Sequence, residues 1–260
     1  YDFVADGVNQ TVWVIDDEDI INTISTEFAK IDALYIADGH HRYETALNYR
    51  NYCRENGISK PGDPQDFQMI YLVDMEHPGL VVFPTHRLVR DLPNFDKEAV
   101  LEKCSEFFYI DEKEGTDTME EDLKKLYDEG KKAFGFYCGK GEWFLLTLKN
   151  IDIMSQMLPN VSKASQSLDV SVLHTLILEK IFGIDKENMA KQINLTYTKF
   201  FTEAIDGVDK GEFQCSFVLN PTRVTEIRDV AAAGEKMPQK STYFYPKMIT
   251  GMVMNNLGVD

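Results

Sequence analysis

The first third of the sequence alternates short apolar runs with helix-like stretches, and this alternation restricts the fold most. Residues 11–15 and 34–37 are rich in β-branched and aromatic side chains, which is typical of strands. Each run is followed by a stretch of helical periodicity, the first capped by Asp16 or Asp17 and the second running from Asp38 to about residue 56. A strand-helix-strand-helix start predicts α/β or α+β architecture.

The rest of the chain continues this mixture, with further strands predicted at 67–73, 80–83, 133–138, 142–148 and 213–219. Helices are predicted at 94–108, 117–127, 167–182 (capped by Ser167 or Asp169), 198–205 and 222–233. Residues 91–150 are rich in Glu, Asp and Lys and poor in candidate site residues. We therefore predict an α+β (mixed α/β) fold in which 91–150 form an inserted subdomain, while 1–90 and 151–260 form a core that carries the site.

Charge and composition exclude several classes of protein. The formal net charge is -16, so a broad basic surface for nucleic acid is not expected. No apolar run approaches the roughly 20 residues that span a bilayer, so no membrane partner is expected. The four cysteines form no Cys-x-x-Cys pair, which disfavours a cysteine-based zinc site and predicts reduced, mostly buried thiols. These features predict a cytoplasmic protein; they leave the oligomeric state open.

The turn Asp38-Gly39-His40-His41-Arg42 stands where a predicted strand ends and a helix begins. A helix N-terminus carries a partial positive charge, so each cation placed there costs about 0.3–1 kcal/mol. Free backbone N–H groups of a first turn also form an anion site. We expect Asp38 to cap the helix, Gly39 to let a ligand approach the backbone, and Arg42 to bind phosphate oxygens. The alternative is an ordinary capped helix with exposed polar residues.

Two other basic segments are candidates for the same site. His86 and Arg87 follow a predicted strand, where sites collect in α/β folds, although a solvated turn is the simpler interpretation. Residues 234–242 approach the P-loop pattern but have Gln239 at the second glycine position and lack the strand-loop-helix context. This segment is therefore no P-loop, and it is either a polyanion contact or a flexible basic loop. The segment places Lys236, Lys240, Ser241 and Thr242 close together, and Lys247 follows shortly after it.

A metal site is a further alternative. His174 lies on the predicted helix 167–182, where a single histidine is more often a partly buried structural residue than a ligand. The sequence has no His-Glu-x-x-His motif. Five residues are still able to converge on a metal in a hydrolase, namely Asp38, His40, His41, His86 and His174.

Four motifs together carry a family resemblance. The first two are ADGHHRYETA at 37–46 and PTHR at 84–87. The third covers residues 168–174, begins with LDV and ends at His174. The fourth covers residues 237–247, begins with MPQKSTYF and ends with Pro246-Lys247. On these motifs the chain resembles the bacterial family called domain of unknown function 1015, from about residue 10 to its end. Members of that family carry additional N-terminal sequence, and this chain begins at Tyr1 rather than Met. We therefore expect a fragment that lacks an N-terminal region.

The Asp38–Arg42 turn is also similar to that of free serine kinases in the ParB/sulfiredoxin-like superfamily. This resemblance implies a strand-turn-helix core that binds the phosphates of a donor with the help of Mg²⁺. It gives catalytic roles to Asp38, His40 and His41, with Asp38 also as the Mg²⁺ ligand. The resemblance covers only this turn, where it implies phosphate-binding roles for Gly39 and Arg42. From the two other basic segments we add further phosphate-binding residues, namely His86, Arg87, Lys240, Ser241 and Thr242. Those kinases use a glutamate base upstream of the motif, for which no residue is assigned here.

Three functions follow as hypotheses. The first is a small-molecule phosphotransferase that moves phosphate from a nucleotide or pyrophosphate to a hydroxyl, such as that of free serine. The second is a regulator that senses a nucleotide or anion at the same turn without catalysis. The third is a metal-dependent hydrolase. The expected partner is a small-molecule phosphorylated ligand.

Overall fold

The computed structural model describes residues 1–5, 7–115, 118–247, 249 and 251–256. The chain divides into two units, residues 1–36 and 37–260, and each is described by itself. Predicted positions outside the described residues are Asp117, where a helix is predicted to begin, residue 116 of the predicted subdomain, and residues 6, 248, 250 and 257–260 of the predicted core.

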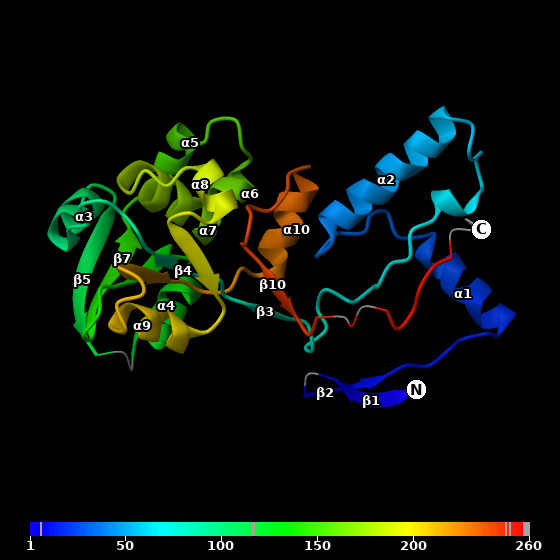
Figure 1. Ribbon diagram of the computed structural model, residues 1–260, viewed down its shortest axis with the longest axis horizontal. Coiled ribbons are helices and arrows are strands. Elements are labelled where there is room, and N and C mark those ends of the chain that lie inside the picture. Colours follow the sequence, from blue (N-terminus) through cyan, green and yellow to red (C-terminus); the bar gives the residue numbers. More distant parts are fainter. Residues whose placement is uncertain (6, 116–117, 248, 250, 257–260) are drawn as a thin grey trace. The chain divides into compact units, whose positions relative to one another are not determined.

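The smaller unit holds an antiparallel hairpin and one helix, β1 (Asp2–Ala5), β2 (Val8–Thr11) and α1 (Glu18–Phe28) (Figure 1). The carboxylate of Asp17 accepts hydrogen bonds from the N–H groups of Asp19 and Ile20, which confirms the predicted cap. The predicted strand 11–15 is wrong beyond its first residue, and the predicted strand 34–37 does not form.

A six-stranded sheet organises the larger unit, with the strand order β5-β7-β6-β9-β4-β8 (Figure 1). All its neighbouring strands run antiparallel. The strands are β4 (His86–Val89), β5 (Phe108–Glu114), β6 (Ala133–Tyr137), β7 (Glu142–Leu148), β8 (Leu195–Thr198) and β9 (Cys215–Val218). An antiparallel sheet with helices on it makes the fold α+β, as the sequence predicted.

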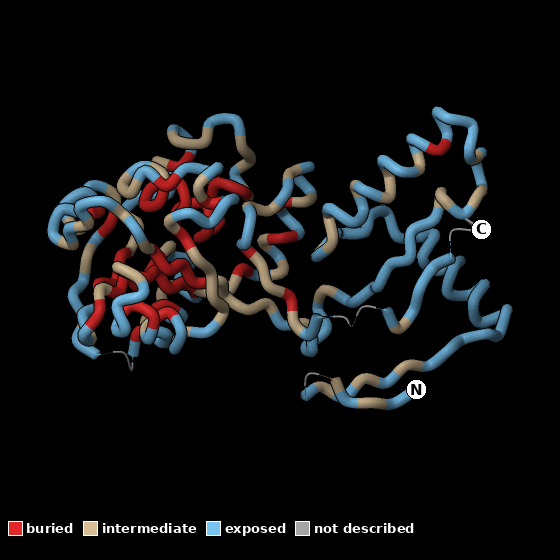
Figure 2. Tube along the Cα trace, viewed as in Figure 1, coloured by how far each residue is buried: buried red, intermediate tan, exposed pale blue. Residues whose placement is uncertain are grey.

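Both faces of this sheet are covered by a hydrophobic core. Successive side chains of a strand point to opposite faces, so a single strand contributes to both cores. On β6, Phe134 and Phe136 belong to one core and Ala133 and Tyr137 to the other. The first core includes the apolar residues of 170–178, and the second includes buried residues of α4 (Met119–Asp128) and α9 (Phe201–Asp209). Figure 2 shows the buried residues gathered along the sheet and these helices.

The predicted division at residues 90 and 151 does not appear in the sheet. Strands β5, β6 and β7 come from within 91–150, yet β6 pairs directly with β9, with Phe136 opposite Phe217. One sheet and one hydrophobic core therefore join residues 91–150 to both flanking segments. The described structure gives no separate core to this region.

The predicted helix 167–182 forms with an unusual winding. It begins as α7 (Asp169–Val172) and continues as the π-helix η2 (Leu173–Ile181). The wider winding shows in the hydrogen bond from the N–H of Phe182 to the carbonyl of Ile177, at 3.0 Å. The predicted cap is wrong, since no side chain caps α7. Asp169 is buried instead and lies 2.9 Å from the Nζ of Lys132.

Of the remaining elements, some match the predictions apart from their ends, whereas others were not predicted. The predicted strand 67–73 does not form, whereas 80–83 becomes β3 (Val81–Phe83), paired with β10 (Tyr243–Tyr245). The helices are α2 (His40–Glu55), η1 (Pro64–Asp66), α3 (Lys97–Cys104), α5 (Ile153–Met157), α6 (Lys163–Gln166), α8 (Lys186–Lys191) and α10 (Val224–Ala232). The elements that were not predicted are η1, α5, α6, α8 and β10. Among the described residues, no helix has both the length and the apolar character needed to cross a membrane.

Candidate functional site

The first turn of α2 has no side-chain cap. Gly39 is the N-cap residue, in the left-handed conformation at φ 90°, so the prediction that Asp38 caps this helix is wrong. No acidic residue stands in the first turn. The first N–H groups of a helix have no intrahelical partner, and here no side chain supplies one. The turn therefore offers backbone donors to an external anion.

Replacing Gly39 by alanine is expected to lower the free energy of unfolding by about 1–2 kcal/mol, the cost of a left-handed L-residue. The new Cβ would also lie 3.0 Å from Nη2 of Arg42 and displace that guanidinium. Gly57→Ala is the matched control, because Gly57 has φ 68° and open space around its Cβ position. Denaturant unfolding should show similar losses for both variants. Only Gly39→Ala should also weaken phosphate binding; equal binding in both would contradict a role for this turn.

The carboxylate of Asp38 holds cations in place beside the turn. Its Oδ2 lies 3.5 Å from Nη2 of Arg42 and 3.2 Å from Nζ of Lys247. All three side chains remain largely exposed. One carboxylate thus offsets part of the charge of two cations, and the balance next to the helix N-terminus is positive.

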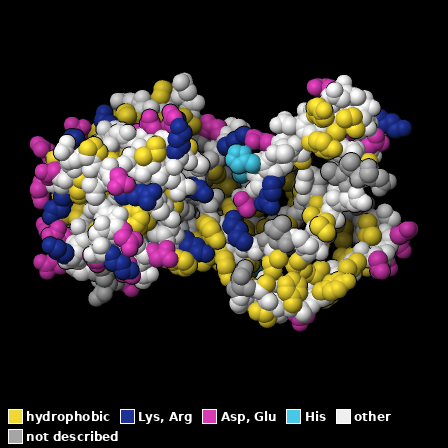
Figure 3. All heavy atoms as spheres, in the orientation of Figure 1, with side chains coloured by type: hydrophobic (Ala, Val, Ile, Leu, Met, Phe, Trp, Pro, Cys, Tyr) yellow, Lys and Arg dark blue, Asp and Glu magenta, His cyan; other side chains and the backbone are white. Residues whose placement is uncertain are grey.

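A second ion pair brings Lys236 to the same helix. Its Nζ pairs with Glu44, and Nδ1 of His41 lies 3.7 Å from the same carboxylate. The hydrogen bond from Lys236 lowers the pKa of Glu44 below its ordinary value. His41 itself is fully exposed and His40 is half-buried. Figure 3 shows a histidine side chain with Lys, Arg and acidic side chains around it on this face.

The His86-Arg87 pair does not lie in a solvated turn, because both residues are buried in strand β4. Nδ1 of His86 accepts a hydrogen bond from the N–H of Leu219 at 3.4 Å, and its ring meets Phe201 edge-on. Burial, with a smaller contribution from the neighbouring charge of Arg87, lowers the pKa of His86 to about 4. His86 is thus a neutral core residue without a surface for phosphate.

Arg87 is a fully buried cation with no carboxylate within 4 Å among the described residues. Its guanidinium donates to the carbonyls of Thr85 and Lys240, the latter at 3.1 Å, and to Nε2 of His174 at 3.0 Å. It also lies over the ring of Tyr197, and its Nε has no hydrogen-bond partner. Burial lowers the pKa of Arg87 to about 10. A buried charge without a counterion is costly, and such groups are usually paired.

The segment from 236 to 247 connects these groups. Lys236 and Lys247 pair with acidic residues beside α2, while the carbonyl of Lys240 binds Arg87. The hydroxyl of Ser241 is buried and donates to the carbonyl of Pro238 at 2.6 Å, so it is engaged within the segment. Thr242 is half-buried and the side chain of Lys240 is exposed. The four motifs singled out in the sequence are therefore linked through this segment.

Comparison with known proteins decides the family. The family described as "Protein of unknown function (DUF1015)" matches residues 1–171. The chain belongs to this family. The match confirms the membership predicted from the motifs. No curated protein matches the chain.

Solved structures similar to this DUF1015 chain each cover 87% of it. A conserved hypothetical protein from Pyrococcus furiosus is 18% identical, with 81% of its chain covered and a TM-score of 0.42. A free serine kinase in complex with AMP is 16% identical, with 78% covered and a TM-score of 0.44. A point mutant of a free serine kinase in complex with ADP is 14% identical, with 78% covered and a TM-score of 0.43.

The residues of this DUF1015 chain do not form the predicted metal site. Among the described residues, no group of three or more His, Cys, Asp and Glu side chains is placed to hold a metal ion. His86 and His174 are buried and bonded elsewhere, and Asp38 faces two cations. The convergence of these residues on a metal is therefore wrong. Asp38 would have to exchange its exposed ion pairs with Arg42 and Lys247 in order to bind Mg²⁺.

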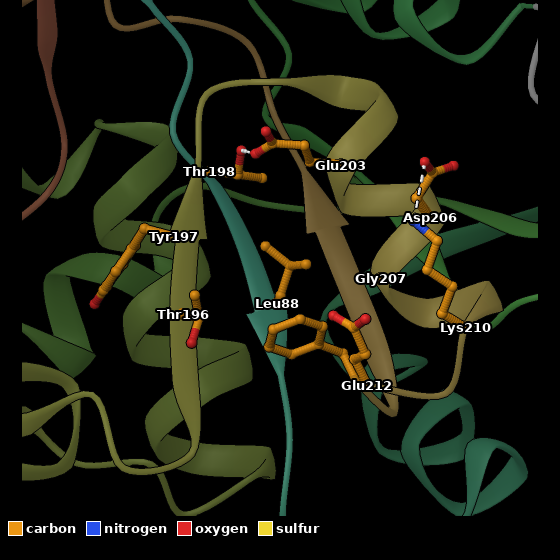
Figure 4. A pocket seen from close by; sticks show the side chains of 10 residues that line it. Leu88, Thr196, Tyr197, Thr198, Glu203, Asp206, Gly207, Lys210 and Glu212 are labelled. Carbon is orange, nitrogen blue, oxygen red and sulfur yellow. Dashed lines mark hydrogen bonds and ion pairs between the residues drawn. The ribbon is translucent and has the colours of Figure 1, made fainter.

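An acidic cavity elsewhere in the larger unit is a poor phosphate site. It has a volume of about 260 Å³ and lies beside β8, β4 and α9 (Figure 4). Three carboxylates line it, those of Glu203, Asp206 and Glu212, against the single cation Lys210. Glu203 accepts a hydrogen bond from Thr198, and Asp206 lies 3.5 Å from Lys210. The excess of negative charge would repel phosphate.

Sequence reasoning missed Lys199 as a neighbour of the site. Its Nζ lies 4.4 Å from the ring centroid of Tyr243, and Nζ of Lys247 lies 4.9 Å from the same centroid. Lys199 follows β8 and is far from residues 236–247 in sequence, so only the tertiary fold brings the two lysines to one ring. No local sequence signal marks it.

Proposed function

We propose that this chain is a small-molecule phosphotransferase that binds the phosphates of a nucleotide or pyrophosphate at the first turn of α2. The observation that carries the proposal is the uncapped turn at Gly39, with Arg42, Lys236 and Lys247 held around it in a chain of net charge -16. The transfer reaction itself is taken from the resemblance of the Asp38–Arg42 turn to that of free serine kinases.

The reaction needs positioning and charge neutralisation more than covalent participation of the protein. The N–H groups of the turn and the guanidinium of Arg42 would bind phosphate oxygens, with Lys236 and Lys247 adding positive charge. The hydroxyl oxygen of the acceptor forms the new bond to phosphorus while the bond to the leaving oxygen breaks. His41, which is fully exposed, or His40 would take the hydroxyl proton.

Arg87 and Lys240 act differently from the prediction under this proposal. Arg87 is buried and binds the backbone of Lys240, so its contribution is to hold the 236–247 segment beside α2. The exposed side chain of Lys240 is free to approach a phosphate. Ser241 would stabilise the same segment from within, because its hydroxyl donates to the carbonyl of Pro238.

The test of transfer uses the full chain with L-serine, Mg²⁺ and either ATP, ADP or pyrophosphate, followed by ³¹P NMR. Phosphoserine should appear with at least one donor and should be lost in Arg42→Ala. Lys210→Ala, which removes a cation from the acidic cavity, is the control and should keep full activity. Absence of phosphoserine with every donor would contradict the serine version of the proposal.

Removing one cation from the turn should weaken binding of ADP at least about tenfold, because a charge-assisted hydrogen bond contributes about 1.5–3 kcal/mol. Arg42→Ala and Lys247→Ala are the informative variants, and Lys210→Ala should change affinity less than about twofold. Isothermal titration calorimetry measures all three. Unchanged affinity in both turn variants would place ADP elsewhere.

A second candidate is a sensor that binds the same ligand without turnover. One observation favours it: the carboxylates nearest the turn, Asp38 and Glu44, are both ion-paired and poorly suited to act as a base. Calorimetric binding of ADP with no phosphorylated product would support the sensor over the phosphotransferase.

A further inference from the structure

A cavity of about 480 Å³ lies beside the π-helix, within the larger unit. Its lining includes His174 and Thr175 from the π-helix, Tyr197 from β8, and Lys236 from the segment that contacts α2. Cavities of about 300–1,000 Å³ are typical of small-molecule sites. π-Helical turns occur frequently at functional sites. Of the side chains that line this cavity, the proposed function uses only that of Lys236.

The buried Arg87 fixes which nitrogen of His174 carries a proton. A guanidinium only donates hydrogen bonds, so Nε2 of His174, at 3.0 Å from Nη2 of Arg87, must accept with its lone pair. Burial lowers the pKa of His174 well below its ordinary value, so the ring is neutral. The remaining proton of a neutral ring then lies on Nδ1.

The Nδ1–H group is available to a ligand. Among the described residues, no group receives a hydrogen bond from it. His174 lines the cavity. Its Nδ1 has no hydrogen-bond partner among the described residues, and it is not sealed from solvent. Because its single lone pair is engaged by Arg87, the ring can donate but has no free site to accept a proton. His174 therefore offers a fixed hydrogen-bond donor.

The charge of Arg87, rather than that of the two lining lysines, favours an anionic oxygen next to this donor, because Lys236 is already paired with Glu44. Arg87 lies directly behind the ring with no carboxylate within 4 Å among the described residues. Lys186 and Lys236 line the cavity, as do Glu179 and Glu235. Glu235 is engaged by the hydroxyls of two serines, Ser162 and Ser165. Burial raises the pKa of Glu179. The cation next to His174 is thus the least compensated charge.

We propose that this cavity is a second ligand subsite, which binds an anionic oxygen group of a small molecule through the Nδ1–H of His174. Arg87 is its positioning residue, since it sets the tautomer of the ring. The inference rests on the proposed function for the identity of the ligand, which would be the hydroxyl acceptor, held by its carboxylate. A phosphate group has the same recognition chemistry and is the other source to be distinguished.

The experiment uses the full chain with ¹⁵N-labelled histidines, followed by long-range ¹H–¹⁵N NMR. Without ligand, His174 should show the neutral Nδ1–H tautomer at pH 7, with exposed His77 as an internal reference. L-Serine and inorganic phosphate are then titrated separately, and ethanolamine, which lacks the carboxylate, is the control. ADP is titrated in a fourth arm while the signals of His40 and His41 are recorded.

The proposal predicts that L-serine shifts the His174 signal in a saturable way and that ethanolamine does not. A shift with phosphate but not L-serine would keep the subsite and overturn the carboxylate ligand. An Nε2–H tautomer, or no shift with either probe, would overturn the subsite. Shifts of His40 and His41 with ADP report on the α2 turn alone, so failure of the cavity and failure of the proposed function remain distinguishable.

Two substitutions separate the donor from the bulk of the ring. In His174→Asn the amide N–H stands near the position of Nδ1, whereas in His174→Gln the amide stands near that of Nε2. L-Serine binding should weaken at least about tenfold in His174→Gln and at most about threefold in His174→Asn. Equal losses in the two variants would contradict the role of the Nδ1–H group.

Discussion

Replacing Phe136 by alanine is expected to lower the free energy of unfolding by about 3–5 kcal/mol, the usual cost of removing a buried aromatic ring. Phe136 is fully buried in β6, and its ring stacks on that of Phe217 in β9 with centroids 4.8 Å apart. The substitution removes this contact and leaves a cavity between a strand of the 91–150 region and a strand of the flanking region. Urea unfolding followed by tryptophan fluorescence and circular dichroism measures the loss.

Tyr109→Ala is the matched control, because Tyr109 is an aromatic residue of the same sheet that is 62% exposed. Its loss should stay below about 1 kcal/mol. The two probes should give one coincident transition over the sheet, since one core spans it. Separate transitions for the 91–150 region and the rest, or a small effect of Phe136→Ala, would support the prediction that 91–150 form an inserted subdomain.

Acid is expected to destabilise the larger unit through its buried neutral histidines. His86 has a pKa of about 4 in the folded chain against an ordinary value of 6.5. Between these values the unfolded chain binds more protons, so the stabilisation is complete above pH 6.5 and is lost as the pH falls toward 4. For His86 alone the loss amounts to about 3 kcal/mol. The lowered pKa of His174 acts in the same direction.

Asp169 acts in the opposite direction and must be separated from His86. Burial raises the pKa of Asp169 to about 6, so the folded chain takes up this proton first and gains stability as the pH falls through 6. The wild type and His86→Asn both contain Asp169, so its contribution cancels when the unfolding free energy of the variant is subtracted from that of the wild type. This difference should be about 3 kcal/mol larger at pH 7 than at pH 4. A difference for His86→Asn that stays constant with pH would show that His86 is not held neutral.

Local sequence patterns predicted most elements of the fold but not their assembly. The hairpin of β6 and β7 and the helices α2 and α10 follow from periodicity and glycine positions. The single sheet did not follow, because pairing of β6 with β9 joins residues about 80 positions apart in sequence. The π-helix was also missed, since six consecutive residues, 173–178, are buried and leave no one-sided stripe that would distinguish its winding from that of an α-helix. Charge composition misled the assignment of 91–150, because charged residues there occupy the exposed positions of strands that share the core.

The candidate site was only partly predictable for the same reason. Unfavourable cations at a helix start pointed to the Asp38–Arg42 turn, and basic residues in an acidic chain pointed to the 236–247 segment. The sequence does not show that Asp38 pairs with Lys247 or that Arg87 is buried against His174, because these contacts span more than 80 residues. The sequence likewise gave no reason to prefer Gly39 over Asp38 as the cap, since both residue types occur there.

The central claim is that the first turn of α2 binds phosphate, and an amide NMR titration of the ¹⁵N-labelled full chain with ADP tests it most directly. Hydrogen bonds from the turn to phosphate oxygens should move the backbone N–H signals of His40, His41 and Arg42 downfield, saturably and together. The same titration of Arg42→Ala should need a several-fold higher ADP concentration. If millimolar ADP leaves these three signals in place, the first turn of α2 is not a phosphate site.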